Sequence, residues 1–445
     1  MSIRKALAFA SLLLLPLSAL AADVQASPVV AGIRVEFILF GLTLLGVALF
    51  HHRTLQVALT GLAVITLYKL TFTGFHGGAG LLGLAHHLGN EWVILTNLLC
   101  LLLGFDILSH HFSASKVPAH LPRILPDNWL GPFVLLLMVF VLSSFLDNIA
   151  AAMIGGTVAA SVFKGKVHIG YIAAIVAASN AGGSGSVVGD TTTTMMWIDG
   201  VSPLHVLHAY VAAGAAVVIF GIAAALQQHR HHPIAADAVT TDPIDRTRLV
   251  IVATILVFAI GTNVLINIRF NEYGDLFPWI GVAVWVAILL TAPLRRPHWN
   301  GLPGAFRGSI FLLSLVLCAS MMPVETLPAA SWQSSLVLGF VSAVFDNIPL
   351  TKLALEQGGF DWGFLAYAVG FGGSMIWFGS SAGVAISNIF HQAKSAGAWI
   401  KGGWHVAVAY VIGFFIMLAA VGWHPHAPHR AEHKQAAAEA ALPAH

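Results

Sequence analysis

Residues 179–194, Ser-Asn-Ala-Gly-Gly-Ser-Gly-Ser-Val-Val-Gly-Asp-Thr-Thr-Thr-Thr, decide the fold of this chain. They follow one apolar run, residues 169–178, and lead into another at residues 195–198. Four glycines within eight positions disfavour a helix, because each costs about 1 kcal/mol relative to alanine. Lipid tolerates irregular backbone only where protein or water covers it. The stretch therefore predicts a broken membrane helix whose polar break forms a binding site.

The composition places the whole chain in a membrane. Apolar residues make up 58% of it and charged residues 9%, with a mean hydropathy of +0.83. Soluble domains carry about 25% charged residues, so we expect an all-α polytopic membrane protein surrounded by lipids. A net charge of +2 without a basic stripe argues against a nucleic-acid partner. Nothing in the sequence indicates an enzyme or a cofactor.

The N-terminus carries the pattern of an exported protein. Arg4 and Lys5 precede an apolar run and Ala19-Leu20-Ala21, which predicts a secretory signal peptide over residues 1–22. An uncleaved first helix is the alternative. Cleavage implies the bacterial inner membrane, with the mature N-terminus and the C-terminus on the periplasmic side. Lysines and arginines concentrate in the loops that would then face the cytoplasm, which supports this orientation.

The chain is predicted to consist of two repeats. A polar connector, residues 227–248, separates residues 23–226 from residues 249–422, and a His-rich tail follows at residues 423–445. Ten spans are expected, five in each half, so the second half would be inverted relative to the first. The third span is expected at residues 92–109. Each half also contains a re-entrant hairpin and a broken helix, at residues 129–163 and 168–198 in the first half and at residues 332–355 and 363–390 in the second.

Two motifs recur in both halves and in the same order. The centre of each hairpin carries an Asp-Asn pair, and each broken helix carries Gly-Gly-Ser followed seven positions after its first glycine by another glycine. The pairs are Asp147-Asn148 and Asp346-Asn347. The glycines expected to unwind the helices are Gly182, Gly183, Gly189, Gly372, Gly373 and Gly379. Repeats with interrupted helices predict a secondary transporter whose site lies near the middle of the membrane.

Asp190 is the leading candidate for an ion-binding residue, because the second break carries Ser380 at the matching position. Sodium prefers oxygen ligands, and we expect Asp190, Ser184 and Thr191 to bind it. Burial favours the protonated form of a carboxyl group, so a proton and a metal ion would compete for this site. The alternative role of Asp190 is to cap the helix that follows the break.

The Asp-Asn pairs also have two possible roles. Asp147 and Asp346 either join the ion and proton site or cap the return arms of the hairpins. The other residues predicted to bind the ion or proton are Asn148, Asn347, Asn180, Ser374, Ser380 and Ser381. Basic residues near the breaks are few, and Lys69 and Lys352 are expected to reach the membrane interface with their charged ends.

At these residues the chain resembles the NhaD-type sodium/proton antiporters. The resemblance rests on Phe-Leu-Asp-Asn-Ile at residues 145–149 and on residues 180–198, and it extends over both halves, residues 129–390. The wider ion-transporter superfamily includes arsenite pumps, citrate carriers and dicarboxylate/sodium symporters. The resemblance implies inverted repeats, two hairpins, two unwound helices and often a homodimer with elevator-like motion. The second break departs from the pattern, since residues 379–383 lack the carboxylate and the threonines.

The function expected from the sequence is exchange of sodium or lithium for protons across the bacterial inner membrane. One alternative is sodium-coupled symport of a small carboxylate or another anion, with sodium at each break. The other alternative is a non-transporting membrane sensor built on the same fold.

Overall fold

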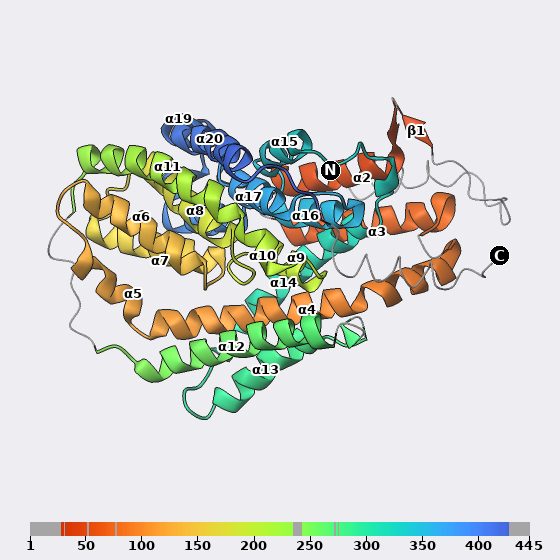
Figure 1. Ribbon diagram of the computed structural model, residues 1–445, viewed down its shortest axis with the longest axis horizontal. Helices are drawn as coiled ribbons and strands as arrows, with labels where there is room; N and C mark the ends of the chain where they lie inside the picture. Colours follow the sequence, from red (N-terminus) through yellow and green to blue (C-terminus); the bar gives the residue numbers. More distant parts are fainter. Residues whose placement is uncertain are drawn as a thin grey trace, which may run out of the picture.

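The computed structural model describes residues 28–426 apart from residues 31, 51–52, 76–77, 235–242, 271–272 and 275. The predicted signal peptide, part of the connector and most of the His-rich tail lie outside the described residues. The described chain is a bundle of helices with one small antiparallel pair of strands, β1 (Val29–Val30) and β2 (Ile33–Arg34) (Figure 1). The predicted all-α class is confirmed.

The first half, up to the connector, contains ten of the labelled helices. They are α2 (Val35–Leu49), α3 (Thr54–Tyr68) with a π-helical turn at Lys69–Thr73, α4 (Gly80–Ala114), α5 (Val117–His120) with a 3-10 turn at Leu121–Ile124, α6 (Leu130–Ser143), α7 (Asn148–Val162), α8 (Ile169–Ser184), α9 (Thr191–Ile198), α10 (Pro203–Leu207) and α11 (Ala209–His231).

The second half follows the connector. Its helices are α12 (Arg246–Arg269), α13 (Trp279–Thr291), α14 (Leu302–Ser320), α15 (Trp332–Ser342), α16 (Asn347–Gln357), α17 (Trp362–Gly372), α18 (Ser381–Ile389), α19 (Ala396–Gly402) and α20 (Trp404–Ala420). Short 3-10 turns lie at Trp299–Gly301, Val324–Thr326 and His391–Lys394.

Several helices have the length and hydropathy of membrane spans. Among the described residues, five stretches are long and apolar enough to cross a membrane, and a sixth is added if α19 and α20, bent by 61°, form one span. The five are Thr54–Thr73, Gly80–Ala114, Pro203–His231, Arg246–Ile266 and Trp299–Ser320. The apolar helices α2, α6, α7, α13 and α17 are shorter, at 10–17 residues. The chain is therefore a multi-pass membrane protein.

Helix α4 begins well before the predicted start of the third span. It runs from Gly80, because the polar residues in its first turns have buried partners that the sequence does not reveal. The His87 Nε2 atom lies 3.0 Å from Ser320 Oγ, and Glu91 Oε2 lies 3.0 Å from Lys352 Nζ. Buried polar groups that are paired in this way do not end a membrane helix.

The two halves repeat the same packing around their breaks. Helix α6 packs against α7 and α8, and α15 packs against α16 and α17. A serine near the end of the first helix bonds to the backbone of the broken helix in each half: the Ser143 hydroxyl donates to Ser179 O at 2.5 Å, and the Ser342 hydroxyl to Val369 O at 2.7 Å. The duplicated motifs thus make equivalent contacts.

The first glycine pair does not unwind its helix, so the prediction is wrong there, whereas the second pair lies where its helix ends. Helix α8 continues through Gly182 and Gly183 to Ser184, while Gly372 ends α17 and Gly373 caps it. The glycines serve close backbone packing instead, because a Cβ on Gly182 would lie 2.0 Å from Phe140 O. A Cβ on Gly372 would lie 2.3 Å from Gly339 O, so the same contact occurs in both halves. Of the six predicted glycines, Gly189, Gly373 and Gly379 lie between the helices of the breaks.

Substitution Gly182→Ala is expected to destabilise the protein by about 1–3 kcal/mol, because the new methyl group would press on a backbone carbonyl that cannot turn away. The apparent melting midpoint in detergent measures this loss. Gly214→Ala in α11 is the matched control, since a Cβ there meets nothing within 4 Å. Equal midpoints for Gly182→Ala and the unchanged protein would show that α6 and α8 are not packed this closely.

Candidate functional site

The Asp-Asn pairs lie where α6 turns into α7 and where α15 turns into α16. Asp147 caps α7 by accepting a hydrogen bond from Ile149 N at 3.2 Å, and Asp346 caps α16 by accepting one from Ile348 N at 3.0 Å. The capping role considered for these residues is therefore confirmed. One carboxylate oxygen of Asp346 also accepts a hydrogen bond from the Ser381 hydroxyl at 3.4 Å.

Each break ends with a cap on the helix that follows it. The Asp190 side chain caps α9 by accepting from Thr192 N at 3.2 Å, and the Ser380 side chain caps α18 by accepting from Gly383 N at 3.3 Å. The two residues hold matching positions, but only the first break receives a carboxylate. Asp190 is 2% exposed.

The threonines after Asp190 stabilise the irregular backbone of the break. The Thr193 hydroxyl donates to Ser186 O and to Asp190 O, and the Thr194 hydroxyl donates to Val187 O and to Asp190 O at 2.9 Å each. The bonds to Ser186 O and Val187 O satisfy carbonyl groups of the break that accept from no backbone N–H of the described residues, whereas Asp190 O also accepts from Thr194 N. Thr191 instead contributes to the lining of a cavity beside the break.

Asparagine side chains join the two halves at the breaks. Asn148 donates to Asn180 Oδ1 at 3.2 Å, and Asn180 in turn donates to Ser374 Oγ in the second half at 2.9 Å. The Asn347 amide lies 3.5 Å from Asp190 Oδ2 and donates to it across the same boundary. The carboxylate of the first break is thus contacted by the first residue of α16, in the second half.

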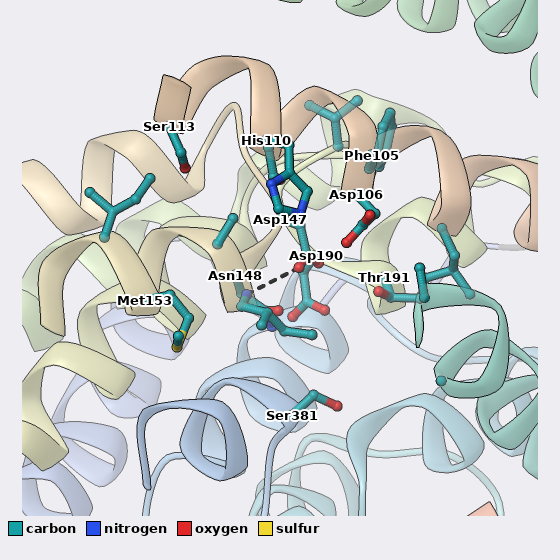
Figure 2. A pocket seen from close by; sticks show the side chains of 18 of the residues that line it. Phe105, Asp106, His110, Ser113, Asp147, Asn148, Met153, Asp190, Thr191 and Ser381 are labelled. Carbon is teal, nitrogen blue, oxygen red and sulfur yellow. Dashed lines mark hydrogen bonds between the residues drawn. The ribbon is translucent and has the colours of Figure 1, made fainter. Parts of the chain in front are cut away.

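A cavity of 990 Å³ opens beside these residues, between α4, α7, α14 and the first break. Figure 2 shows the labelled side chains of several predicted site residues around it. The predicted residues that line it are Asp147, Asn148, Asp190, Thr191, Asn347 and Ser381. The other predicted residues do not line it: Asn180, Ser184, Asp346, Ser374 and Ser380.

Ser184 lies close to Asp190 without facing the cavity. Its hydroxyl donates to Ala181 O at 2.8 Å, one turn back along α8. A Cβ built on Gly370 would lie 3.2 Å from Asp190 Oδ2 and 3.4 Å from Ser184 Cβ, so this glycine of α17 fits between the two residues. Ser184 remains a predicted sodium ligand.

Polar residues that the sequence did not single out line another part of the cavity. Asp106 and His110 extend from α4, and Lys116 follows that helix. The Asp106 Oδ2 atom is buried and has no hydrogen-bond partner among the described residues. The sequence does contain one signal for Asp106: it is an aspartate inside an apolar segment, and a carboxylate within a membrane is costly unless it has a function.

The two lysines expected to reach the interface are buried instead. Lys352 is 2% exposed, and its Nζ lies 3.0 Å from Glu91 Oε2 and 2.5 Å from Glu356 Oε1. Lys69 is 5% exposed and donates to Met321 O at 2.8 Å. The snorkelling prediction is wrong for both, because each charge has found a partner inside the protein.

Known proteins similar to this chain are transporters. Sodium/proton antiporter 2 of Arabidopsis thaliana is 27% identical over 317 residues, which cover 63% of this chain and 72% of that protein. Sodium/proton antiporter 1 of the same plant is 25% identical over 324 residues, covering 63% and 52%. The Na(+)/H(+) antiporter NhaD of Alkalimonas amylolytica is 24% identical over 304 residues, covering 56% and 60%. The chain therefore spans only part of each relative.

No protein-family model matches the chain. The crystal structure of the YdaH transporter of Alcanivorax borkumensis aligns with 84% of this chain and 98% of that chain, at 15% identity and a TM-score of 0.41. The resemblance predicted from the motifs is confirmed by the sequence relatives: the curated proteins that this chain resembles include NhaD-type and plant sodium/proton antiporters.

Proposed function

We propose that this chain exchanges sodium, or lithium, for protons across the bacterial inner membrane. The observation that carries the proposal is the position of Asp190. Its carboxylate is buried at a helix break and lines a cavity together with Asp147. It also accepts a hydrogen bond from the side-chain amide of Asn347 in the other half. An unpaired charge is costly at such a place, so the carboxylate is stable with either a proton or a cation bound.

In this proposal, sodium and a proton compete for one site, and that competition couples the transport of sodium to the transport of protons. Sodium binding to Asp190 displaces the proton, with Thr191 and Ser184 as further oxygen ligands and Asp147 nearby to balance the charge. The two halves act as inverted repeats with re-entrant hairpins α6–α7 and α15–α16, so that the site is opened to one side at a time. The names of the antiporter relatives support the same exchange.

Symport of a small carboxylate is the second candidate, and the size of the cavity favours it. A volume of 990 Å³ exceeds what a bare ion requires and falls near the upper end of typical ligand pockets, roughly 300–1,000 Å³. Against it, Lys116 is the only lysine or arginine among the described residues that line the cavity.

Flux measurements with the full chain in inverted vesicles separate the candidates. A dye that reports the pH gradient should show recovery of fluorescence when sodium or lithium is added, because the ion enters as protons leave. Uptake of a labelled dicarboxylate without such recovery would show that the protein is a symporter and not an antiporter. If correctly folded protein shows neither flux, the non-transporting sensor is the remaining candidate.

A further inference from the structure

A second pocket, of 420 Å³, lies at one end of the bundle. It is formed by the last turns of α4, the first turn of α12 and the connection between α13 and α14. Helices α4, α12 and α13 contact one another, and α14 contacts α4 (Figure 1). The residues that line it are His110, His111, Ala114, Arg248, Arg296, Pro297, His298, Trp299 and Asn300.

The pocket is strongly basic in a chain that is otherwise poor in charge. Two arginines and three histidines line it, and none of its described lining residues is acidic. The adjacent Asp245 forms ion pairs with two arginines: its Oδ2 lies 2.9 Å from Arg295 Nε and 3.6 Å from Arg248 Nε. The Arg295 hydrogen bond lowers the pKa of Asp245, which stays ionised. Arg248, Arg295 and Arg296 carry three positive charges against the single negative charge of Asp245, which leaves two positive charges at this end of the bundle.

Two hydrogen bonds connect the basic side chains that line the pocket. Arg248 Nη1 lies 3.1 Å from His111 Nδ1, and His110 Nε2 lies 3.3 Å from His298 Nδ1. Arg296 makes no hydrogen bond or ion pair with another described residue. In each of these hydrogen bonds one imidazole nitrogen is the acceptor, so the positive charges that a bound anion would compensate are those of Arg248 and Arg296.

Apolar side chains continue from the pocket along the outer surface of the bundle. Val250 lies two residues after Arg248 and is 58% exposed, and Leu294 lies two residues before Arg296 and is 53% exposed. Leu290, one turn earlier on α13, is 66% exposed. The pocket therefore lies where the apolar surfaces of membrane helices end, which is the level of lipid headgroups.

We propose that this pocket binds the phosphate group of an anionic phospholipid. The guanidinium groups of Arg248 and Arg296 donate to the phosphate oxygens, with Asn300 as a further donor, while the acyl chains lie along α12 and α13. Basic pockets between membrane helices are suited to such headgroups. The proposal is independent of antiport, because the pocket contains none of Asp147, Asp190 and Asp346.

Lipid binding to the purified, delipidated full chain tests the proposal. Native mass spectrometry should show phosphatidylglycerol bound at least about tenfold more tightly than phosphatidylcholine, with about a tenfold loss in Arg296→Gln. Arg307→Gln is the matched control, since this exposed arginine of α14 lies outside the pocket. His298→Gln provides a second variant, and melting midpoints show that each protein is folded.

Inorganic phosphate distinguishes the two sources of the ligand group. If phosphate displaces phosphatidylglycerol in proportion to its concentration, the pocket recognises the phosphate of the lipid, as proposed. If phosphate binds in an Arg296-dependent manner but phosphatidylglycerol does not, the ligand is free phosphate and the lipid assignment is overturned. Equal phosphatidylglycerol binding by the unchanged protein, Arg296→Gln and His298→Gln would also overturn it.

Discussion

Asp190→Asn should lower sodium-driven proton movement at least about hundredfold, equivalent to about 2.7 kcal/mol, while leaving the protein folded. Asparagine is as good a helix cap as aspartate, so the bond from Thr192 N that begins α9 is retained. The carboxylate charge is lost, and with it the group for which a proton and sodium would compete. Initial rates of fluorescence recovery in inverted vesicles measure the change.

The appropriate control is Asp127→Asn, which makes the same chemical change at an exposed position before α6. It should retain the full rate, and both variants should melt within a few degrees of the unchanged protein. Full activity of Asp190→Asn would refute the central role of this residue. A melting midpoint that falls together with the rate would show that Asp190 is needed for the fold rather than for exchange.

Replacing the other two carboxylates should slow ion exchange to different extents. Asp147 lines the cavity, whereas Asp346 does not line it and accepts a hydrogen bond from Ser381, which does. Asparagine retains the capping bond at either position. We therefore expect Asp147→Asn to slow exchange more than Asp346→Asn does. The reverse order would indicate that the working cavity lies beside the second break.

The sequence was sufficient to locate the helices and breaks that build the site. Composition predicted a membrane protein, and the repeated Asp-Asn pairs marked the turns at which α7 and α16 begin. These features are local, because capping and helix breaking depend on residues a few positions apart. The first glycine pair was misassigned because its role depends on a neighbouring helix: Gly182 is required by Phe140 O, not by its own backbone conformation.

Contacts between the halves could not be predicted from the sequence. The Asn347–Asp190 bond joins residues 157 positions apart, and nothing in either motif specifies that their side chains meet. The burial of Lys352 was missed for the same reason, since its partner Glu91 lies in a different helix and half. Long-range pairing is decided by packing geometry, which hydropathy and motif spacing do not encode.

Lys352→Met is expected to destabilise the protein by about 3–5 kcal/mol, the range found when one partner of a buried ion pair is removed. Methionine nearly preserves the length and apolar stem of the side chain, so packing is little changed. The carboxylates of Glu91 and Glu356, whose side chains are 11% and 28% exposed, would lose the charge that compensates them. Because the Glu91 contact joins α4 to α16, the loss should appear in the melting midpoint of the whole protein. Lys394→Met, at an exposed position, is the matched control.

A second substitution separates loss of charge compensation from loss of packing. Adding Glu91→Gln to Lys352→Met removes one of the stranded charges and should restore part of the lost stability, although Glu91→Gln alone should destabilise. This coupling between the two sites is the signature of a true ion pair, because defects in packing would add rather than cancel. If the double variant melts below Lys352→Met alone, the lysine contributes through its volume and the buried pair does not stabilise the contact between α4 and α16.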